Sequence, residues 1–286
     1  MQHNIKTKIF LNGRFIFQEE ARLPIFTPGF LYGWGLFETM RSYKKHIVYF
    51  SRHLERIEKS CGLINIAFPY PLERLKEIIQ EAIKINGFPD ASVRLTLWRA
   101  KKGTDTLVIV KKYRPYPTKK YKKGFRACIS RLKQNENSFL AHLKTSSYLF
   151  YQLAYLEAKN KELDEAIILN NRGYITEGSR TNIFLIKDRE LFTPALECGC
   201  LDGITRQVVW DLAKKYRIPV STGNFTLSDL YAADEAFFTN SLIGIMPLTY
   251  LERNPITRGG IGKITKFFMQ KYNLLLTHSN AGLESV

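Results

Sequence analysis

The sequence predicts a mixed α/β protein of two domains. An Asn-Gly pair between two short apolar runs, at residues 9–17, indicates a β-hairpin, because both central residues of such a turn need positive φ. Later segments carry apolar residues at the 3.6-residue period of an amphipathic helix. A stretch rich in lysine and proline, at about residues 111–124, is typical of a linker. The 286 residues suffice for one large or two ordinary domains.

In the first half of the chain, turn and cap residues delimit a sheet and two helices. Ser51 is predicted to cap a helix that ends at about Cys61, with Gly62 following it. Pro71 opens a second helix, which Gly87 closes. The predicted elements are, in order, the hairpin at 9–17, helices at 51–61 and 71–86, and strands at 93–97 and 107–110.

The second half of the chain continues with short strands and helices. Gly173 and its polar neighbours supply a turn between two of the strands. The predicted elements are strands at 125–129, 166–169, 174–176 and 183–186, and helices at 146–159, 204–216 and 260–276. With a linker at about 111–124, a smaller N-terminal α/β domain covers residues 1–116, and a larger, strand-rich C-terminal α/β domain covers residues 117–286.

The chain carries 43 basic and 26 acidic residues, a formal net charge of +17, which raises the question of nucleic acid binding. The densest basic cluster, Lys111–Gly124, is interleaved with aromatic residues that could stack on RNA bases. Its prolines favour a linker, and anionic small-molecule substrates explain the charge as easily. Nucleic acid is therefore not the expected partner, and an RNA-binding protein on a retired enzyme scaffold is the alternative from a different class.

The sequence shows no targeting or membrane signal. Residues 1–6 lack the apolar segment of a signal peptide, and no apolar run reaches the roughly 18 residues of a spanning helix. The cysteines, which are Cys61, Cys128, Cys198 and Cys200, match neither a zinc pattern nor a disulfide framework. We expect a cytoplasmic protein with reduced thiols, no metal and no membrane partner.

Polar residues at the ends of predicted elements in the second half form a candidate ligand site. Glu177 ends a strand, where a carboxylate could keep a pyridine nitrogen protonated. Ile204 and Thr205 follow Gly203 at a helix start, whose free N–H groups and dipole favour a phosphate. Small polar residues at Thr239–Leu242 end another strand. Together these groups suit pyridoxal phosphate, although a surface carboxylate and an ordinary helix start are the simpler alternatives for each alone.

Three basic residues could complete such a site. Lys144 lies at a polar junction before a helix, where its amine could hold an aldehyde cofactor or simply face solvent. Arg56 lies on a helix face and suits a phosphate, with pairing to an exposed acidic residue of the same helix as the alternative. Arg99 has the parity of the apolar strand residues before it. We therefore expect it on the apolar face beside an anionic partner, unless the strand twists near Trp98.

Four segments, in order along the chain, match the pattern of one known family. They comprise the aromatic and Phe-Glu stretch Tyr32–Arg41, the arginine helix Arg52–Ile57, the motif Glu177–Arg206 and the later strand Ala233–Phe237. Together they resemble the class IV, or fold-type IV, pyridoxal-phosphate enzymes over nearly the whole chain, and Glu177–Arg206 fits the family signature at every constrained position.

The resemblance implies a two-domain fold-type IV enzyme with pyridoxal 5'-phosphate in the C-terminal domain. Lys144 would be the catalytic lysine that forms the Schiff base, and Glu177 would hold the pyridine nitrogen. The further cofactor-binding residues it implies are Arg56, Tyr148, Ile204, Thr205 and Ser241, and the substrate-binding residues are Phe37, Thr39, Arg41, Arg99 and Leu242. It also implies a homodimer that acts on a small amino acid and a 2-oxo acid.

The leading hypothesis is an aminotransferase that moves an amino group between a branched-chain-like amino acid and a 2-oxo acid. Thr39 stands where branched-chain aminotransferases usually carry glycine, and the interval from Lys144 to Glu157-Ala158 is one residue shorter than theirs. The shorter interval resembles D-amino acid aminotransferases and 4-amino-4-deoxychorismate lyases, and Thr39 resembles the lyases. A lyase that releases pyruvate and 4-aminobenzoate is therefore the alternative. The D-amino acid enzyme is less favoured, because Ala100-Lys101 follows Arg99 where glycine and histidine are expected.

Overall fold

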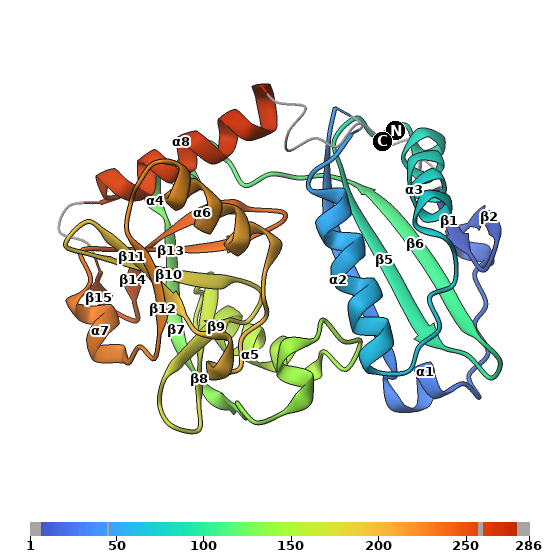
Figure 1. Cartoon of the computed structure of the whole chain (residues 1–286), viewed down its shortest axis with the longest axis horizontal. Coiled ribbons are helices and arrows are strands. Elements are labelled where there is room, and N and C mark those ends of the chain that lie inside the picture. Colours follow the sequence, from blue (N-terminus) through green and yellow to red (C-terminus); the bar gives the residue numbers. More distant parts are fainter. Residues whose placement is uncertain (1–6, 45, 257–259, 279–286) are drawn as a thin grey trace. The chain divides into compact units, whose positions relative to one another are not determined.

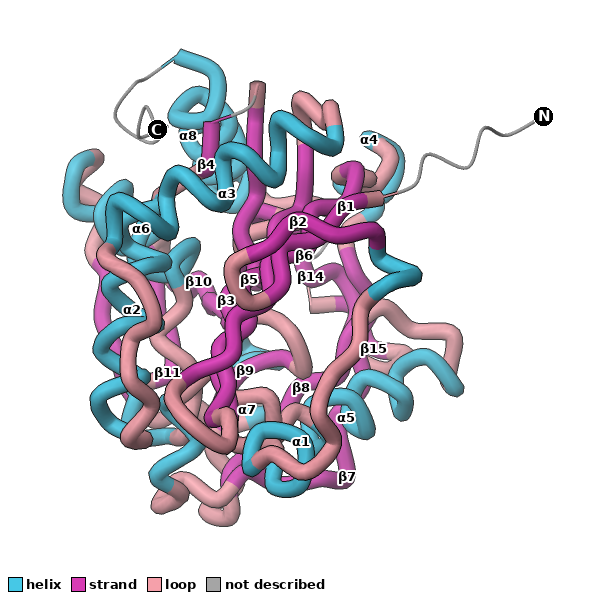
Figure 2. Tube along the Cα trace, turned by 90° about the vertical axis from the view of Figure 1, so that its right-hand side faces the viewer, coloured by secondary structure: helices cyan, strands magenta, loops and turns pink. Residues whose placement is uncertain are grey.

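The computed structural model of the chain describes residues 7–44, 46–256 and 260–278. These residues divide into two compact units (Figure 1). Unit 1 comprises the chain up to Arg114 together with Lys144–Ser147, and unit 2 comprises Pro115–Leu143 and the chain from Tyr148 to Thr277. Helices and strands occur in both units (Figure 2), which confirms the predicted mixed α/β class.

Unit 1 is built on an antiparallel sheet of six strands in the order β2-β1-β6-β5-β3-β4. The strands are β1 (Lys8–Leu11), β2 (Arg14–Phe17), β3 (Gly35–Tyr43), β4 (His46–Ile47), β5 (Ala91–Arg99) and β6 (Thr104–Lys112). The predicted hairpin is confirmed: Asn12 and Gly13 join β1 to β2 with φ of 46° and 90°.

The helices of unit 1 are η1 (Gln18–Glu20), α1 (Pro28–Tyr32), α2 (Phe50–Leu63) and α3 (Leu72–Asn86). Helix α2 packs along β3, and α3 packs along β6 and β1 (Figure 1). Pro71 and Gly87 bound α3 as predicted. The prediction for α2 was wrong at both ends, because Tyr49 precedes the first helical residue in a left-handed conformation, and Gly62 lies inside the last turn. The Tyr49 ring is buried, and Ser51 lies inside the first turn instead of capping the helix.

Part of the predicted linker is helical. Helix α4 (Thr118–Lys123) starts after Pro117 and ends at Gly124, whose φ of 73° suits glycine. The Tyr121 ring packs against the apolar core of unit 2, and its hydroxyl donates to the Ile243 carbonyl at 2.9 Å. The lysine-rich composition indicated an exposed segment and gave no signal for the contacts that anchor it, among them the bond from the Thr249 hydroxyl to the Lys123 carbonyl at 2.9 Å.

Unit 2 is built on a mixed sheet of nine strands in the order β12-β11-β10-β13-β14-β7-β8-β9, with β15 paired to β14. The strands are β7 (Phe125–Gln134), β8 (Glu165–Asn170), β9 (Ile175–Gly178), β10 (Asn182–Lys187), β11 (Glu190–Pro194), β12 (Val220–Gly223), β13 (Glu235–Asn240), β14 (Gly244–Leu251) and β15 (Asn254–Pro255). Strand β7 runs parallel to both β14 and β8, whereas β9 pairs antiparallel with β8, and β10 pairs antiparallel with β11 and β13.

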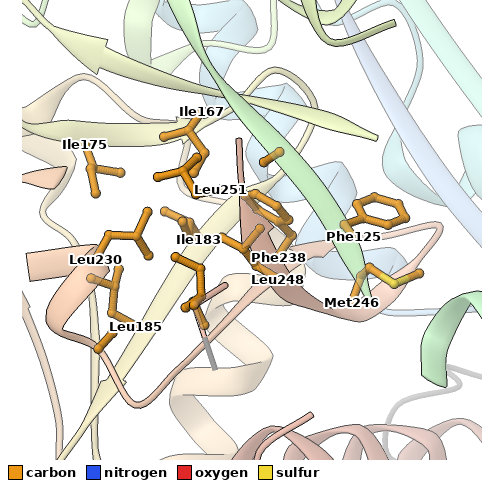
Figure 3. Packing of buried hydrophobic residues seen from close by; sticks show 14 residues of the cluster. Phe125, Ile167, Ile175, Ile183, Leu185, Leu230, Phe238, Met246, Leu248 and Leu251 are labelled. Carbon is orange, nitrogen blue, oxygen red and sulfur yellow. The ribbon is translucent and has the colours of Figure 1, made fainter. Parts of the chain in front are cut away.

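The helices of unit 2 are η2 (Phe139–His142), α5 (Leu149–Asn160), η3 (Leu196–Cys198), α6 (Ile204–Lys215), α7 (Leu227–Ala232) and α8 (Lys263–His278). Helix α6 begins at Ile204 as predicted and packs on β13, and α5 packs on β7 and β8. None of the helices within the described ranges is long and apolar enough to cross a membrane. The aromatic rings of Phe125 and Phe238 meet in the apolar core with aliphatic residues from several strands (Figure 3).

Truncating this core should destabilise the protein. The Phe238 side chain is fully buried, so Phe238→Ala removes its contacts and leaves a cavity, at a cost of about 3–5 kcal/mol in the free energy of unfolding. Denaturant-induced unfolding measures the change. The control Tyr231→Ala, at an exposed ring, should change stability by only about 0.5 kcal/mol. Equal effects of the two substitutions would contradict the assignment of the core.

Candidate active site

The segment that contains Lys144 pairs with the start of β3 in unit 1. The Phe37 N–H donates to the Lys144 carbonyl at 2.9 Å, and the Ser146 N–H donates to the Gly35 carbonyl at 2.8 Å. An antiparallel bridge joins Leu36 to Thr145 between these bonds. Backbone pairing of this kind fixes the position of Lys144 beside β3, which a solvated lysine at a helix entry would not need.

One face of the unit 1 sheet gathers cationic groups around Phe37. The Lys144 Nζ lies 4.7 Å from the centre of the Phe37 ring, and the Arg94 guanidinium lies 3.7 Å from it. Register pairs Thr39 with Arg94, so Phe37, Thr39 and Arg94 share this face. Sequence reasoning missed Arg94. The signal was present, because Arg94 alternates with the buried strand residues and therefore points away from them.

The opposite face of β3 carries a buried charge network with helix α2. The Glu38 carboxylate is 1% exposed and accepts from Arg56 Nε and Nη2 at 2.7 and 2.8 Å, and His53 Nδ1 lies 2.7 Å from it. Burial raises the pKa of Glu38, but the charges and hydrogen bonds of Arg56 and His53 outweigh it and hold this pKa well below its usual range. Arg56 thus pairs with Glu38 and not with an acidic residue of its own helix. Sequence reasoning did not assign Glu38 to the site.

Arg41 and Arg99 lie apart from each other in unit 1. The Arg41 guanidinium lies 4.3 Å from the Tyr113 ring centre, and its Nε is buried without a hydrogen-bond partner among the described residues. Arg99 Nη1 donates to the Asn65 carbonyl at 3.1 Å, beside the end of α2. Within the described part of the chain, Arg99 lacks the anionic partner that the sequence predicted. The alternation of buried and half-buried residues along β5 breaks at Trp98, which is buried, so that Arg99 is half-buried. Arg41 and Phe37 lie on the same face of β3, because they are an even number of residues apart along the strand. Arg99 does not lie with them.

Glu177 in unit 2 is a buried carboxylate with several donors. It is 5% exposed at the end of β9, and its Oε2 accepts from Asn182 Nδ2 at 3.3 Å and from the Leu201 N–H at 3.2 Å. The Tyr151 hydroxyl also hydrogen-bonds to Glu177, and burial raises the pKa of this phenol. Glu177 is therefore not a surface turn residue. Tyr151, which sequence reasoning missed, supports the carboxylate from helix α5.

The start of α6 lies next to this carboxylate. Asn182 Nδ2 donates to the Leu201 carbonyl at 2.7 Å as well as to Glu177, which ties the strand to the segment before the helix. A Cβ at Gly203 would clash with Asn182 Oδ1, so only glycine fits this approach. Ile204 and Thr205 are the buried first residues of α6. Asn182 thus shapes the backbone between β10 and the start of α6.

Three further predicted residues lie around the turn at Ser179–Arg180. The Tyr148 hydroxyl donates to the Ser179 carbonyl at 3.0 Å. Asn240 Nδ2 donates to the Arg180 carbonyl at 3.1 Å, and Asn240 Oδ1 accepts from the Leu242 N–H at 2.9 Å. The partly buried residues Ser241 and Leu242 thus occupy a turn that is tied to the same loop as Glu177. Unit 2 brings together Tyr148, Glu177, Ile204, Thr205, Ser241 and Leu242 through shared hydrogen-bonded segments.

The cysteines do not compete as reactive groups in this part of the molecule. Cys61, Cys128, Cys198 and Cys200 are buried free thiols. Burial raises the pKa of Cys200, which lies next to Leu201, and so favours its protonated, unreactive form.

Each unit, taken by itself, carries residues that suit one part of a phosphorylated pyridine aldehyde. A buried carboxylate with fixed donors suits a protonated ring nitrogen, and the N-terminus of α6 with the Thr205 hydroxyl suits a phosphate. A lysine amine on a structured backbone suits the aldehyde. These groups define a class of enzyme that works through pyridoxal phosphate.

Comparison with known proteins agrees with this class. Residues 35–251 match the family model of class IV aminotransferases. The chain is 32% identical to the aminodeoxychorismate lyase of Bacillus subtilis, over 85% of this chain and 86% of that protein. It is 30% identical to a D-alanine aminotransferase of Listeria monocytogenes, over 97% and 99% of the two chains.

Among solved structures, the branched-chain aminotransferase of Thermoproteus uzoniensis with norvaline is similar, with a TM-score of 0.88, 30% identity and 94% of each chain covered. The chain belongs to the class IV aminotransferase family, and it is a pyridoxal-phosphate enzyme of fold-type IV.

Replacing Glu38 by Gln should destabilise unit 1. The change leaves the Arg56 guanidinium beside a buried neutral amide, so the free energy of unfolding at pH 7 should fall by about 3–5 kcal/mol. The folded pKa of Glu38 lies below its ordinary value of 4.5, so the stabilisation is complete above that pH and is lost as the pH falls further. Unfolding free energies of wild type and variant should therefore converge on acidification.

The control for this prediction is Glu77→Gln, which removes an exposed ion pair with Arg74. It should change the free energy of unfolding by no more than about 0.5 kcal/mol. A constant difference between wild type and Glu38→Gln from pH 7 down to acid would show that Glu38 does not act through its charge.

Proposed function

We propose that this enzyme transfers an amino group between an aliphatic, branched-chain-like amino acid and a 2-oxo acid, with Lys144 as the catalytic lysine. The observation that carries the proposal is the structured backbone around Lys144, which holds its amine beside Phe37 and Arg94 on one face of the sheet. An unprotonated lysine amine there can serve as a base, and a guanidinium nearby can bind a carboxylate.

The catalytic and cofactor-binding residues have separate roles in the proposed reaction. When bound, pyridoxal phosphate supplies an electron sink for the carbanion at the substrate Cα. Lys144 Nζ removes the Cα proton and later returns it. The Glu177 carboxylate keeps a proton at the ring nitrogen, supported by its donors Asn182, Leu201 and Tyr151. The proposed phosphate ligands are Arg56, Ile204, Thr205 and Ser241, and Tyr148 is proposed to lie beside the ring.

The substrate would lie against residues of β3 and its neighbours. Phe37, which is buried against the Arg94 guanidinium, is proposed to contact an aliphatic side chain, and Arg41 carries a buried Nε suited to an anionic acceptor. Thr39 shares their face of the strand. Leu242 and Arg99 stay proposed contacts on the basis of the family pattern. The similarity to branched-chain aminotransferases of Thermoproteus uzoniensis and Escherichia coli supports an aliphatic substrate.

A lyase acting on 4-amino-4-deoxychorismate is the second candidate. Thr39 favours it, as does the 32% identity to the aminodeoxychorismate lyase of Bacillus subtilis. The same lysine and the same proton abstraction would serve that reaction, so the cofactor residues do not distinguish the two activities. D-Amino acid transfer is a third candidate, favoured by the relatives of Listeria and disfavoured by Ala100-Lys101 after Arg99.

We also propose that the enzyme is a homodimer. The segment around α1 exposes large apolar side chains, with Phe26 at 79%, Phe30 at 63% and Tyr32 at 74%. Large exposed apolar side chains gathered in one short segment suit a protein contact. Sedimentation at micromolar concentration should therefore give twice the chain mass of 33.2 kDa.

A substrate panel tests the proposed activity. The purified enzyme is incubated with 2-oxoglutarate and a set of L- and D-amino acids, and in parallel with aminodeoxychorismate. The proposal predicts transfer from aliphatic L-amino acids. Release of 4-aminobenzoate with negligible amino transfer would establish the lyase, and a colourless protein that binds RNA in a salt-dependent way would refute both enzymes.

Replacing Lys144 by Ala should abolish the activity. Loss of the amine removes both the group that holds the aldehyde and the base, so the visible absorbance of the purified protein should disappear and the rate should fall at least about 100-fold. Absorbance spectra and the transfer assay measure the two effects. The exposed Lys159→Ala is the matched control and should keep both colour and rate. A coloured, active Lys144→Ala enzyme would exclude this lysine.

A further inference from the structure

Glu165 is a fully buried carboxylate outside the set of residues assigned above. It is 0% exposed at the start of β8. Its Oε1 accepts from the Ala166 N–H at 2.9 Å, from the Ser179 N–H at 3.1 Å and from the Ser179 hydroxyl, and its Oε2 accepts from the Thr181 hydroxyl at 3.2 Å. Through these hydrogen bonds Glu165 holds the turn between β9 and β10.

That turn separates Glu177, which is proposed to hold the ring nitrogen, from Asn182, which hydrogen-bonds to Glu177. Glu177 precedes it on β9, and Asn182 follows it on β10. The Gly178 N–H donates to the Thr181 carbonyl across the turn at 2.6 Å. A Cβ at Gly178 would clash with Thr181 Oγ1 and would lie 3.1 Å from Glu165 Cγ, so the glycine is required by this packing.

The chemistry of the pairing explains the small hydroxyl residues of the turn. A buried carboxylate is costly unless hydrogen bonds replace its hydration. Burial raises the pKa of Glu165, and the charge of Arg180 and the hydroxyls of Ser179 and Thr181 oppose that rise. The Arg180 guanidinium is itself held 3.5 Å from the Tyr155 ring centre. The turn therefore supplies the hydrogen-bond donors that the buried Glu165 carboxylate needs. The carboxylate, as their acceptor, fixes the conformation of the turn.

We propose that Glu165 is a positioning residue for the cofactor. It fixes the turn Gly178–Thr181, and the turn sets the separation of Glu177 and Asn182 and so the direction of the Glu177 carboxylate. The Asn182 amide bonds to both Glu177 and the Leu201 carbonyl, so a shift of the turn also reaches the start of α6. This inference rests on the proposed role of Glu177 opposite the ring nitrogen.

Two variants of Glu165 separate positioning from mere burial. Glu165→Ala leaves the donors of Ser179 and Thr181 without their acceptor, so the turn should shift and the dissociation constant for pyridoxal phosphate should rise at least about tenfold. The visible absorbance maximum of the bound cofactor should shift as well. Glu165→Gln keeps one oxygen as an acceptor, and the hydroxyl of Thr181 can turn to accept from the amide. It should restore affinity to within about threefold of wild type.

The matched control is Glu235→Ala. Glu235 is also a buried carboxylate of unit 2, and it accepts from the Ile264 N–H at 3.0 Å and the Thr265 N–H at 2.7 Å at the start of α8. Its loss should lower the melting temperature about as much as Glu165→Ala does. Cofactor affinity and the absorbance maximum should stay at their wild-type values.

The proposal is overturned if Glu165→Ala lowers the melting temperature as the control does and leaves cofactor affinity and absorbance unchanged. Should Glu165→Ala fail to fold, Thr181→Val removes one donor of the turn with little change in volume. An affinity lowered by several-fold supports the proposal, and an unchanged affinity refutes it. Wild-type protein that binds no pyridoxal phosphate would instead refute the proposed function itself.

Discussion

Burial of carboxylates is the constraint on which the arrangement of both units depends. Glu38, Glu165 and Glu177 are each almost completely removed from solvent. An unpaired charge in such a place costs several kcal/mol, so the chain must supply donors for every one of them. Those donors come from a helix, a turn and a loop segment, and satisfying each carboxylate therefore fixes the backbone of the elements that carry the donors.

This constraint explains how a reactive site is held rigid by common residues. In unit 1, the network of Glu38 anchors Arg56, and backbone pairing anchors Lys144 on the other face of β3. In unit 2, Glu165 anchors the turn, and Asn182 joins Glu177 to the start of α6. Groups that contact a cofactor need precise positions. The residues proposed for this role are thus held by hydrogen bonds that do not involve the cofactor.

Local signals in the sequence predicted much of the fold. Asn12-Gly13 and Gly87 act through their own backbone preferences, so their turn and helix end were correctly predicted. The start of α2 was not, because Tyr49 takes a left-handed conformation that no local pattern in the sequence indicates. Likewise Glu177 was proposed as a site residue from its motif, whereas Glu165 meets its partners only after β8 has paired with β9 and β10 has joined the same sheet. No pattern in the sequence predicts which acidic side chain will be buried beside which hydroxyl group.

The central claim is that the charge of Glu177, not only its shape, supports amino transfer. Single-turnover transfer from an aliphatic L-amino acid by Glu177→Gln enzyme, loaded with pyridoxal phosphate, tests it most directly. The account predicts that the visible band persists while the rate falls at least about 100-fold, since a neutral amide cannot hold a proton at the ring nitrogen. A rate equal to that of the wild-type enzyme, with the cofactor fully bound, would contradict the account.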